Sequence, residues 1–115
     1  MKTIRGAITT KNTREDILTD TTILIKEIIE VNKLKERDII SIFFSATKDL
    51  DAAYPAEAVR NMGITSVPMM CFQEMDVKGS LSHCIRVMLL INCDEEKEIK
   101  HVYLKDTKKL RPDLV

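Results

Sequence analysis

The first third of the chain pairs a β-branched segment with an amphipathic one. Thr3–Thr10 has the composition of a strand and is closed by three polar residues. Thr13 suits the N-cap of a following helix, with acidic residues in the first turn, where the helix dipole favours negative charge. Beyond this cap, residues on one face recur at helical spacing: Ile17, Thr21, Leu24, Ile28 and Val31. The pattern predicts a strand and then a helix that ends near Leu34.

The rest of the chain alternates short apolar runs with turn-forming residues. Ile39–Ser45 has the length and apolar character of a buried strand, and a loop over Ala46–Tyr54 follows. Pro55 suits the first turn of a short helix over Ala56–Met62, which Gly63 ends. Three further strands are predicted: Val67–Phe72, His83–Asn92 and His101–Lys105. A turn around Gly79 separates the first two of these, and Leu110–Asp113 forms an irregular tail.

The predicted order of elements is therefore β-α-β-α-β-β-β. We expect an α+β fold, a single mixed β-sheet with helices packed on one face, in one domain over residues 1–115. Two helices cannot cover both faces of such a sheet. Because Val67–Phe72 and Cys84–Ile91 are strongly apolar, we expect partner subunits to cover the second face, and so a homo-oligomer.

Charge and composition exclude several classes of function. The 18 basic and 18 acidic residues cancel, and there is no tryptophan, which argues against nucleic-acid binding. No apolar run reaches the length of a membrane span, and the first five residues do not resemble a signal peptide. Three cysteines without paired spacing (Cys71, Cys84, Cys93) favour neither disulfides nor a metal site. We expect a cytoplasmic protein.

Familiar catalytic motifs are absent from the sequence. It has no nucleophile elbow, no phosphate-binding glycine loop and no zinc-binding histidine motif, and it has only three glycines. His83 and His101 lie in strand-like surroundings, where an ordinary surface or hydrogen-bonded role is the simpler interpretation. Nothing here requires a cofactor.

Arginines within predicted strands are the most informative residues. Arg86 interrupts a very apolar strand, and Arg5 lies in the first strand. An outward-facing strand residue and a ligand-binding residue are both compatible with the position of Arg86. If Arg5 and Arg86 converge, they form a carboxylate site, because the planar guanidinium binds carboxylates through two hydrogen bonds. Arg60 and Arg111 are more typical of solvated surface residues.

Three other residues carry weaker signals. Glu74 follows a predicted strand and could accept hydrogen bonds, although a glutamate at a strand end is usually solvated. Cys71 lies close by, but a free cysteine is usually a small buried apolar residue. Tyr103 offers a hydroxyl or merely packs.

Several short stretches together resemble the AroH class of monofunctional chorismate mutases. Each is short, but they follow one another in family order from end to end of the chain. The stretches are Ile4–Ala7, Ser45–Thr47 with Asp49–Leu50, Tyr54–Arg60, Val67–Pro68, Cys71–Val77, Cys84–Val87, His101–Leu104 and Leu110–Leu114.

The resemblance implies a homotrimer with a pseudo-barrel core and active sites between subunits. It implies conversion of chorismate into prephenate without a cofactor, in phenylalanine and tyrosine biosynthesis. By resemblance, Arg86 binds the side-chain carboxylate and the ether oxygen of chorismate. Arg5 and Tyr103 hold a carboxylate, and Glu74 with Cys71 meets the ring hydroxyl.

The resemblance also implies an outer set of substrate-binding residues. Arg60 helps to line the entrance, and Tyr54, Ala56 and Leu110 form an apolar wall. Met70 belongs to the same substrate-binding set. Tyr54 stands where the family usually has phenylalanine.

Two other functions remain compatible with the residues themselves. One is a small trimeric imine or enamine deaminase, which also places an arginine against a substrate carboxylate. The other is a trimeric regulatory module that binds a small anionic metabolite between its subunits.

Overall fold

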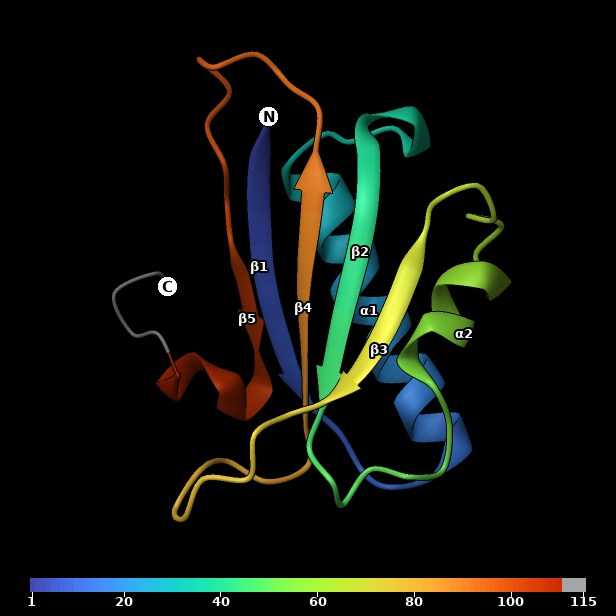
Figure 1. Ribbon diagram of the computed structural model, residues 1–115, viewed down its shortest axis with the longest axis vertical. Coiled ribbons are helices and arrows are strands. Elements are labelled where there is room, and N and C mark those ends of the chain that lie inside the picture. Colours follow the sequence, from blue (N-terminus) through green and yellow to red (C-terminus); the bar gives the residue numbers. More distant parts are fainter. Residues whose placement is uncertain (111–115) are drawn as a thin grey trace.

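The computed structural model describes residues 1–110 and contains a five-stranded mixed sheet with two α-helices behind it (Figure 1). The predicted order of strands and α-helices and the α+β class are confirmed. Two short 3₁₀ helices, η1 and η2, are additional. The elements are β1 (Lys2–Thr9), α1 (Arg14–Val31), η1 (Glu36–Asp38), β2 (Ile39–Ala46), α2 (Pro55–Asn61), β3 (Met69–Gln73), β4 (Cys84–Ile91), β5 (Val102–Leu104) and η2 (Lys105–Lys109).

The sheet has the strand order β3-β2-β4-β1-β5, so β4 lies at its centre. β4 runs antiparallel to both of its neighbours, β1 and β2. The two edge strands are parallel to the strands beside them, β5 to β1 and β3 to β2. The first strand of the chain is therefore held between two strands from its second half.

The helices cover one face of the sheet and enclose the main core there. Alternate residues of β1, β2 and β4 point toward α1 and are almost fully buried, among them Ile8, Phe44 and Leu89. Gly6 allows this close packing. A Cβ atom built at Gly6 would lie 2.9 Å from Ile28 Cδ1 and 2.9 Å from the carbonyl oxygen of Val102.

The observed strands are displaced by one or two residues from their predicted limits where the backbone requires it. Pro68 has no N–H group, so the strand predicted over Val67–Phe72 begins only after it, although its carbonyl accepts a hydrogen bond from Ile42. His83 and Lys105 have positive φ angles of 51° and 54°, which place both outside the extended region. They lie immediately outside β4 and β5.

Helix α1 ends before the predicted limit at Leu34. Its C-cap is Asn32, whose amide donates hydrogen bonds to the carbonyls of Ile28 and Lys100 and accepts one from Lys100 N–H. Lys33 then adopts a positive φ of 52°, which ends the helix. The predicted tail beyond Leu110, with Arg111, lies outside the described residues.

No helix within residues 1–110 covers the second face of the sheet, which faces the viewer in Figure 1. Four large apolar side chains on this face are 40–56% exposed: Phe43, Met70, Phe72 and Met88. We call this face the open face. Within the same range, no helix is long and apolar enough to cross a membrane.

Candidate active site

The strand register places one row of side chains across the open face. Arg86 on β4 lies opposite Ala7 on β1 and Ser45 on β2. The row continues from Ala7 to Tyr103 on β5, and from Ser45 to Phe72 on β3. Ala7 itself is fully buried and packs with Cys84 and Tyr103. The sheet therefore brings together residues that are nearly a hundred positions apart in sequence.

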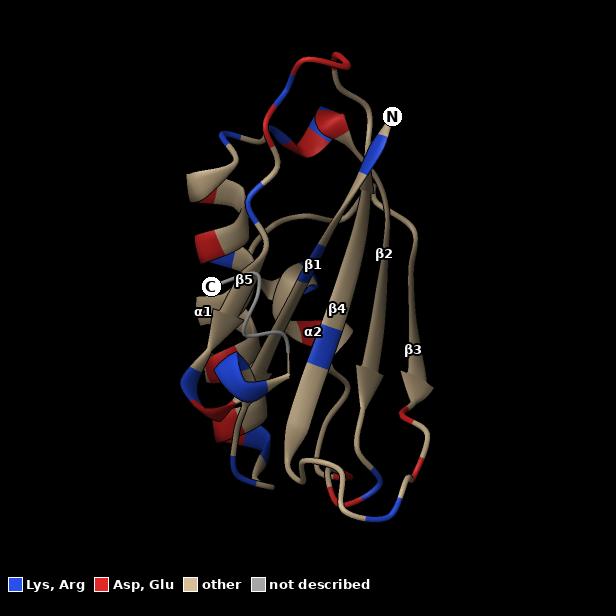
Figure 2. Ribbon diagram, turned by 90° about the vertical axis from the view of Figure 1, so that its left-hand side faces the viewer, with Lys and Arg blue, Asp and Glu red and all other residues tan. Residues whose placement is uncertain are grey.

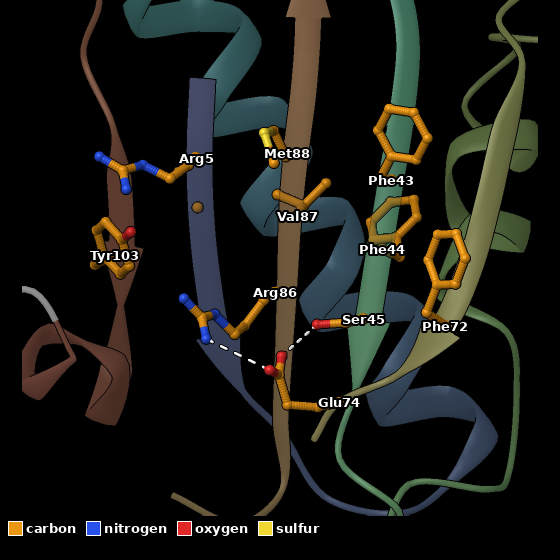
Figure 3. Close-up of a pocket in the computed structure, with 11 residues that line it drawn as sticks. Arg5, Phe43, Phe44, Ser45, Phe72, Glu74, Arg86, Val87, Met88 and Tyr103 are labelled. Atoms are coloured by element: carbon orange, nitrogen blue, oxygen red, sulfur yellow. Dashed lines mark hydrogen bonds and ion pairs between the residues drawn. The ribbon is translucent and has the colours of Figure 1, made fainter. Parts of the chain in front are cut away.

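A cavity of about 220 Å³ opens along this row (Figure 3). Arg5, Glu74, Arg86 and Tyr103 line it, with apolar side chains on the β2–β3 side. Arg5 lies two residues before Ala7 on β1 and so shares its face. The two arginines that the sequence singled out thus line the same cavity. Figure 2 shows the sheet nearly edge-on, with blue bands on β1 and β4 where its basic residues lie.

Glu74 is held by backbone and side-chain contacts. Its amide donates a hydrogen bond to the carbonyl of Ala46 at 2.9 Å, which extends the parallel pairing of β3 with β2. The Ser45 hydroxyl donates to Glu74 Oε2 at 2.5 Å, and Arg86 Nη1 lies 3.6 Å from Oε1. The carboxylate is therefore fixed against the guanidinium, and both side chains remain partly exposed to the cavity.

The other end of the row is anchored by η2. Thr107 is fully buried, and its hydroxyl donates to the carbonyls of Ala7 and Leu104. Leu110 packs against the small buried cluster that contains Ala7 and Tyr103. On the same side, His101 Nδ1 accepts a hydrogen bond from the Arg5 amide at 2.9 Å. These contacts fix the position of β5, which carries Tyr103.

The remaining predicted site residues do not join this cavity within one chain. Cys71 points to the other side of β3 and, with the exposed Tyr54, lines a separate cavity of about 680 Å³. Ala56 packs in the main core, and Arg60 is exposed on α2. Met70 lies on the open face opposite Phe43. Within one chain, these predicted residues outside the cavity are therefore distributed over a second cavity, the main core, the surface of α2 and the open face.

Sequence reasoning assigned no role to Ser45, Phe43 or Phe72. The motif around Ser45 matched the family, but its pairing with Glu74 depends on the parallel register of β2 and β3. The alternation of apolar and polar residues in Ile39–Ala46 would have placed Phe43 and Ser45 on one face. It could not show which strand lies next to β2.

Comparison with known proteins identifies the family to which this arrangement belongs. The family described as chorismate mutase type I matches residues 1–114. The chain is 48% identical to chorismate mutase AroH of Bacillus subtilis, over 96% of this chain and 90% of that protein. It is 40% identical to chorismate mutase AroH of Thermus thermophilus, over 96% and 93%. A solved structure of a chorismate mutase from Clostridium thermocellum has a TM-score of 0.92 and 55% identity, over 95% of this chain and 99% of that one.

The chain belongs to the type I chorismate mutase family. Its activity is that of a chorismate mutase, an isomerase that converts chorismate into prephenate. Neither the family match nor these relatives support the deaminase or the anion-binding regulatory module.

The thiol of Cys84 is not suited to nucleophilic chemistry in this mutase. It lies at the start of β4, two residues before Arg86, and is 3% exposed. Burial raises its pKa to about 11, so it is protonated at neutral pH. Among residues 1–110, no group of three or more His, Cys, Asp or Glu side chains could hold a metal ion.

Proposed function

We propose that the cavity on the open face binds chorismate and that Arg86 is its principal catalytic residue. The observation that carries this proposal is a guanidinium that lines the cavity beside a fixed carboxylate, Glu74, 3.6 Å away. Arg5 and Tyr103 line the opposite side of the same cavity and hold a substrate carboxylate. Leu110, which packs beside Tyr103, contributes an apolar wall.

The rearrangement of chorismate requires conformational control more than acid–base chemistry. One C–O bond breaks and one C–C bond forms within the same molecule, so no nucleophile or redox centre takes part. Chorismate carries two carboxylates, and cationic groups fixed on a rigid sheet hold it in the compact reactive conformation. Arg5 and Arg86 lie on adjacent strands of such a sheet.

Charge develops during the reaction because the C–O bond breaks ahead of C–C bond formation. Negative charge grows on the ether oxygen, where the Arg86 guanidinium stabilises it more strongly than in the ground state. Positive charge spreads over the ring, near which the Glu74 carboxylate is favourable. Ser45 holds that carboxylate through a hydrogen bond, and Glu74 also meets the ring hydroxyl.

We propose further that the complete site forms between subunits of a homotrimer with a pseudo-barrel core. Three observations support this assembly. The open face carries a contiguous set of exposed apolar side chains. The cavity of about 220 Å³ is smaller than the roughly 300–1,000 Å³ typical of small-molecule sites. Finally, Tyr54 and Cys71 line a separate cavity, and Arg60 is exposed on α2. In the proposed trimer a neighbouring subunit supplies these three residues together with the backbone around Ala56, and Met70 lies in the interface.

The principal test of the catalytic proposal is the variant Arg86→Ala. We expect kcat/KM to fall by about 10²–10³-fold or more, because the variant removes charge stabilisation that strengthens in the transition state. The loss of chorismate absorbance measures the rate. Arg37→Ala, at an exposed position on η1, is the matched control and should retain full activity. Near-normal turnover of an Arg86 variant with a neutral isostere, citrulline, would remove the proposed mechanism.

The intersubunit site has its own test. Arg86→Ala and Arg60→Ala alter opposite sides of the proposed interface, so each is expected to be impaired alone. Trimers assembled from a mixture of the two contain some sites with both native residues and should recover part of the activity. A monomeric mass in solution, or no recovery after mixed refolding, would contradict the shared site.

We also propose that residues 1–115 form one domain that works in the cytoplasm, in phenylalanine and tyrosine biosynthesis. The three cysteines are all free thiols, as expected in a reducing compartment.

A further inference from the structure

The side chain of Thr47 replaces a backbone group at the point where β2 and β4 separate. Thr47 N–H donates to the carbonyl of Cys84 at 3.0 Å, as regular antiparallel pairing requires. In a regular pair the second hydrogen bond would run from Cys84 N–H to the carbonyl of Thr47. Here Cys84 N–H donates instead to the Thr47 hydroxyl oxygen at 3.0 Å. The carbonyl of Thr47 instead accepts from Leu50 N–H and closes a turn. The hydroxyl thus takes the place of the Thr47 carbonyl in the pairing of β2 with β4, which leaves that carbonyl free to form the turn.

Asp49, two residues further along the turn, stabilises this arrangement through hydrogen bonds. The Thr47 hydroxyl donates its hydrogen to Asp49 Oδ1 at 2.5 Å. The amide of His83 donates to the same carboxylate at 3.1–3.2 Å, and His83 Nδ1 lies 3.3 Å from Oδ2. His83 adopts a φ of 51°, an uncommon conformation for a residue with a side chain. We call Thr47, Asp49 and their bonds to His83 and Cys84 the strand clamp.

The strand clamp adjoins the groups that the proposed chemistry uses. Cys84 lies two residues before Arg86, and Thr47 lies two residues after Ser45, which holds Glu74. On the other flank, Thr10 N–H donates to the carbonyl of His83 at 2.9 Å, so this end of β4 is fixed against β1 as well. A shift of the strand end would move Arg86 and the partner of Glu74 relative to each other.

We propose that Thr47 and Asp49 are positioning residues for the chorismate mutase reaction, which hold Arg86 and Glu74 in register through the strand clamp. This inference rests on the proposed role of Arg86. The clamp residues do not line the cavity of about 220 Å³, so they act only through β2 and β4. Since Arg86 acts chiefly in the transition state, loss of the clamp lowers kcat more than it raises KM.

The charge state of Asp49 agrees with this role. Partial burial acts to raise the pKa of the Asp49 carboxyl, but hydrogen bonds from the Thr47 hydroxyl and the His83 amide outweigh burial and lower the pKa below its ordinary value of 3.8. The carboxylate is therefore ionised throughout the neutral range and accepts the hydrogen bonds from the Thr47 hydroxyl and the His83 amide.

The first experiment compares two threonine variants that remove the same kind of hydrogen bond. In each case the Thr hydroxyl donates to an aspartate and accepts a backbone N–H: Thr47 in the clamp and Thr13 at the N-cap of α1. We expect Thr47→Val to lower kcat about tenfold to a hundredfold with KM changed less than threefold. Thr13→Val should lower the melting temperature but leave kcat unchanged. Thr47→Ser, which keeps the hydroxyl, should restore kcat.

Asp49→Asn provides an independent variant of the same clamp, and we expect it to lower kcat in the same direction. It also serves if Thr47→Val fails to fold. Normal kcat in folded Asp49→Asn and Thr47→Val would overturn the inference and leave the role of Arg86 untouched. An equal fall of kcat in Thr13→Val and in Thr47→Val would also overturn the inference, because the loss of activity would then reflect lower stability of the whole protein.

A second experiment tests whether the clamp acts through Arg86. Arg86→Lys keeps the positive charge but lacks the planar guanidinium group. The kcat of this variant should therefore depend less on the exact position of the side chain at residue 86. In that background, Thr47→Val should lower kcat by less than threefold. An equal loss in both backgrounds would overturn the inference. If Arg86→Lys and Arg86→Ala were both fully active, the proposed function would fail instead, and the two failures are therefore distinguishable.

Discussion

The two faces of the sheet are built from the same strands, yet one is a buried core and the other is the partly exposed surface on which we propose that chorismate binds. Residues of β4 that point toward α1 are aliphatic and 0–4% exposed: Ile85, Val87, Leu89 and Ile91. Between them, Arg86 and Met88 point to the open face and remain partly exposed. The two-residue period of a strand therefore places the core residues and the proposed catalytic residue at adjacent positions. Substitutions at neighbouring positions should have different kinds of consequence.

The first prediction contrasts Leu89→Ala with Met88→Ala. Leu89 is fully buried, so its truncation should lower the free energy of unfolding by about 2–5 kcal/mol, through lost burial and the cavity left behind. Met88 is 42% exposed within one chain, and its truncation should act mainly on assembly. Urea denaturation at two protein concentrations measures both effects. If Met88→Ala lowered the free energy of unfolding as much as Leu89→Ala, and by the same amount at both protein concentrations, the proposed difference between the two faces of the sheet would be contradicted.

The second prediction concerns the helix-covered side of β1. In Gly6→Ala the added methyl group would meet a backbone oxygen, that of Val102 at the start of β5, as well as Ile28. We expect a loss of about 1–3 kcal/mol in the free energy of unfolding, because a backbone atom cannot turn aside as a side chain does. Thermal and urea unfolding provide the measurement. A variant as stable as the parent would show that α1 and β5 have room to relax.

The third prediction tests the open face with a single hydroxyl. Ser45→Ala removes the hydrogen bond to Glu74 and should lower kcat about tenfold, since bonds to charged groups contribute about 1.5–3 kcal/mol. Ser66→Ala is a matched control because the Ser66 hydroxyl donates to a surface glutamate, Glu36. That control should leave kcat unchanged. An equal kcat for Ser45→Ala and Ser66→Ala would mean that catalysis does not depend on the hydrogen bond from Ser45 to Glu74.

The smallest effect is expected at Cys84, which lies at the start of β4. Because its pKa is raised to about 11, the reactive thiolate is scarce at pH 8 and becomes abundant only above the pKa. Together with burial, this predicts that iodoacetamide leaves Cys84 unmodified in the native protein and modifies it after unfolding. Mass spectrometry of digested protein measures the labelling. Rapid native labelling at pH 8 would show that this strand end opens readily.

Local patterns in the sequence were sufficient to predict the elements of the fold. The 3.6-residue period after Thr13 and the β-branched runs gave the order of strands and helices, which the structure confirms. Errors fell at ends set by backbone details, such as the missing N–H of Pro68 and the positive φ of His83. The proline is visible in the sequence and could have shortened the predicted strand, whereas the φ angle of His83 is not contained in any local pattern.

The candidate site was only partly accessible from sequence. Arg86 stood out because a charged residue in an apolar strand needs a polar environment. Its proximity to Glu74, however, depends on β2 lying between β3 and β4, a non-local arrangement. The resemblance to a family supplied the set of residues, and the structure brings only some of them together in one cavity. The assembly that would unite them remains a proposal.

The place of β1 between β4 and β5 has a consequence for synthesis on the ribosome. The strand made first cannot acquire either neighbour until residues 84–104 have emerged, so the nascent chain carries an unpaired apolar strand for most of translation. Since the cavity takes residues from both ends of the chain, we expect a product that ends before β5 to lack activity. Folding and the ability to bind substrate should arise together, late, once the full polypeptide is released.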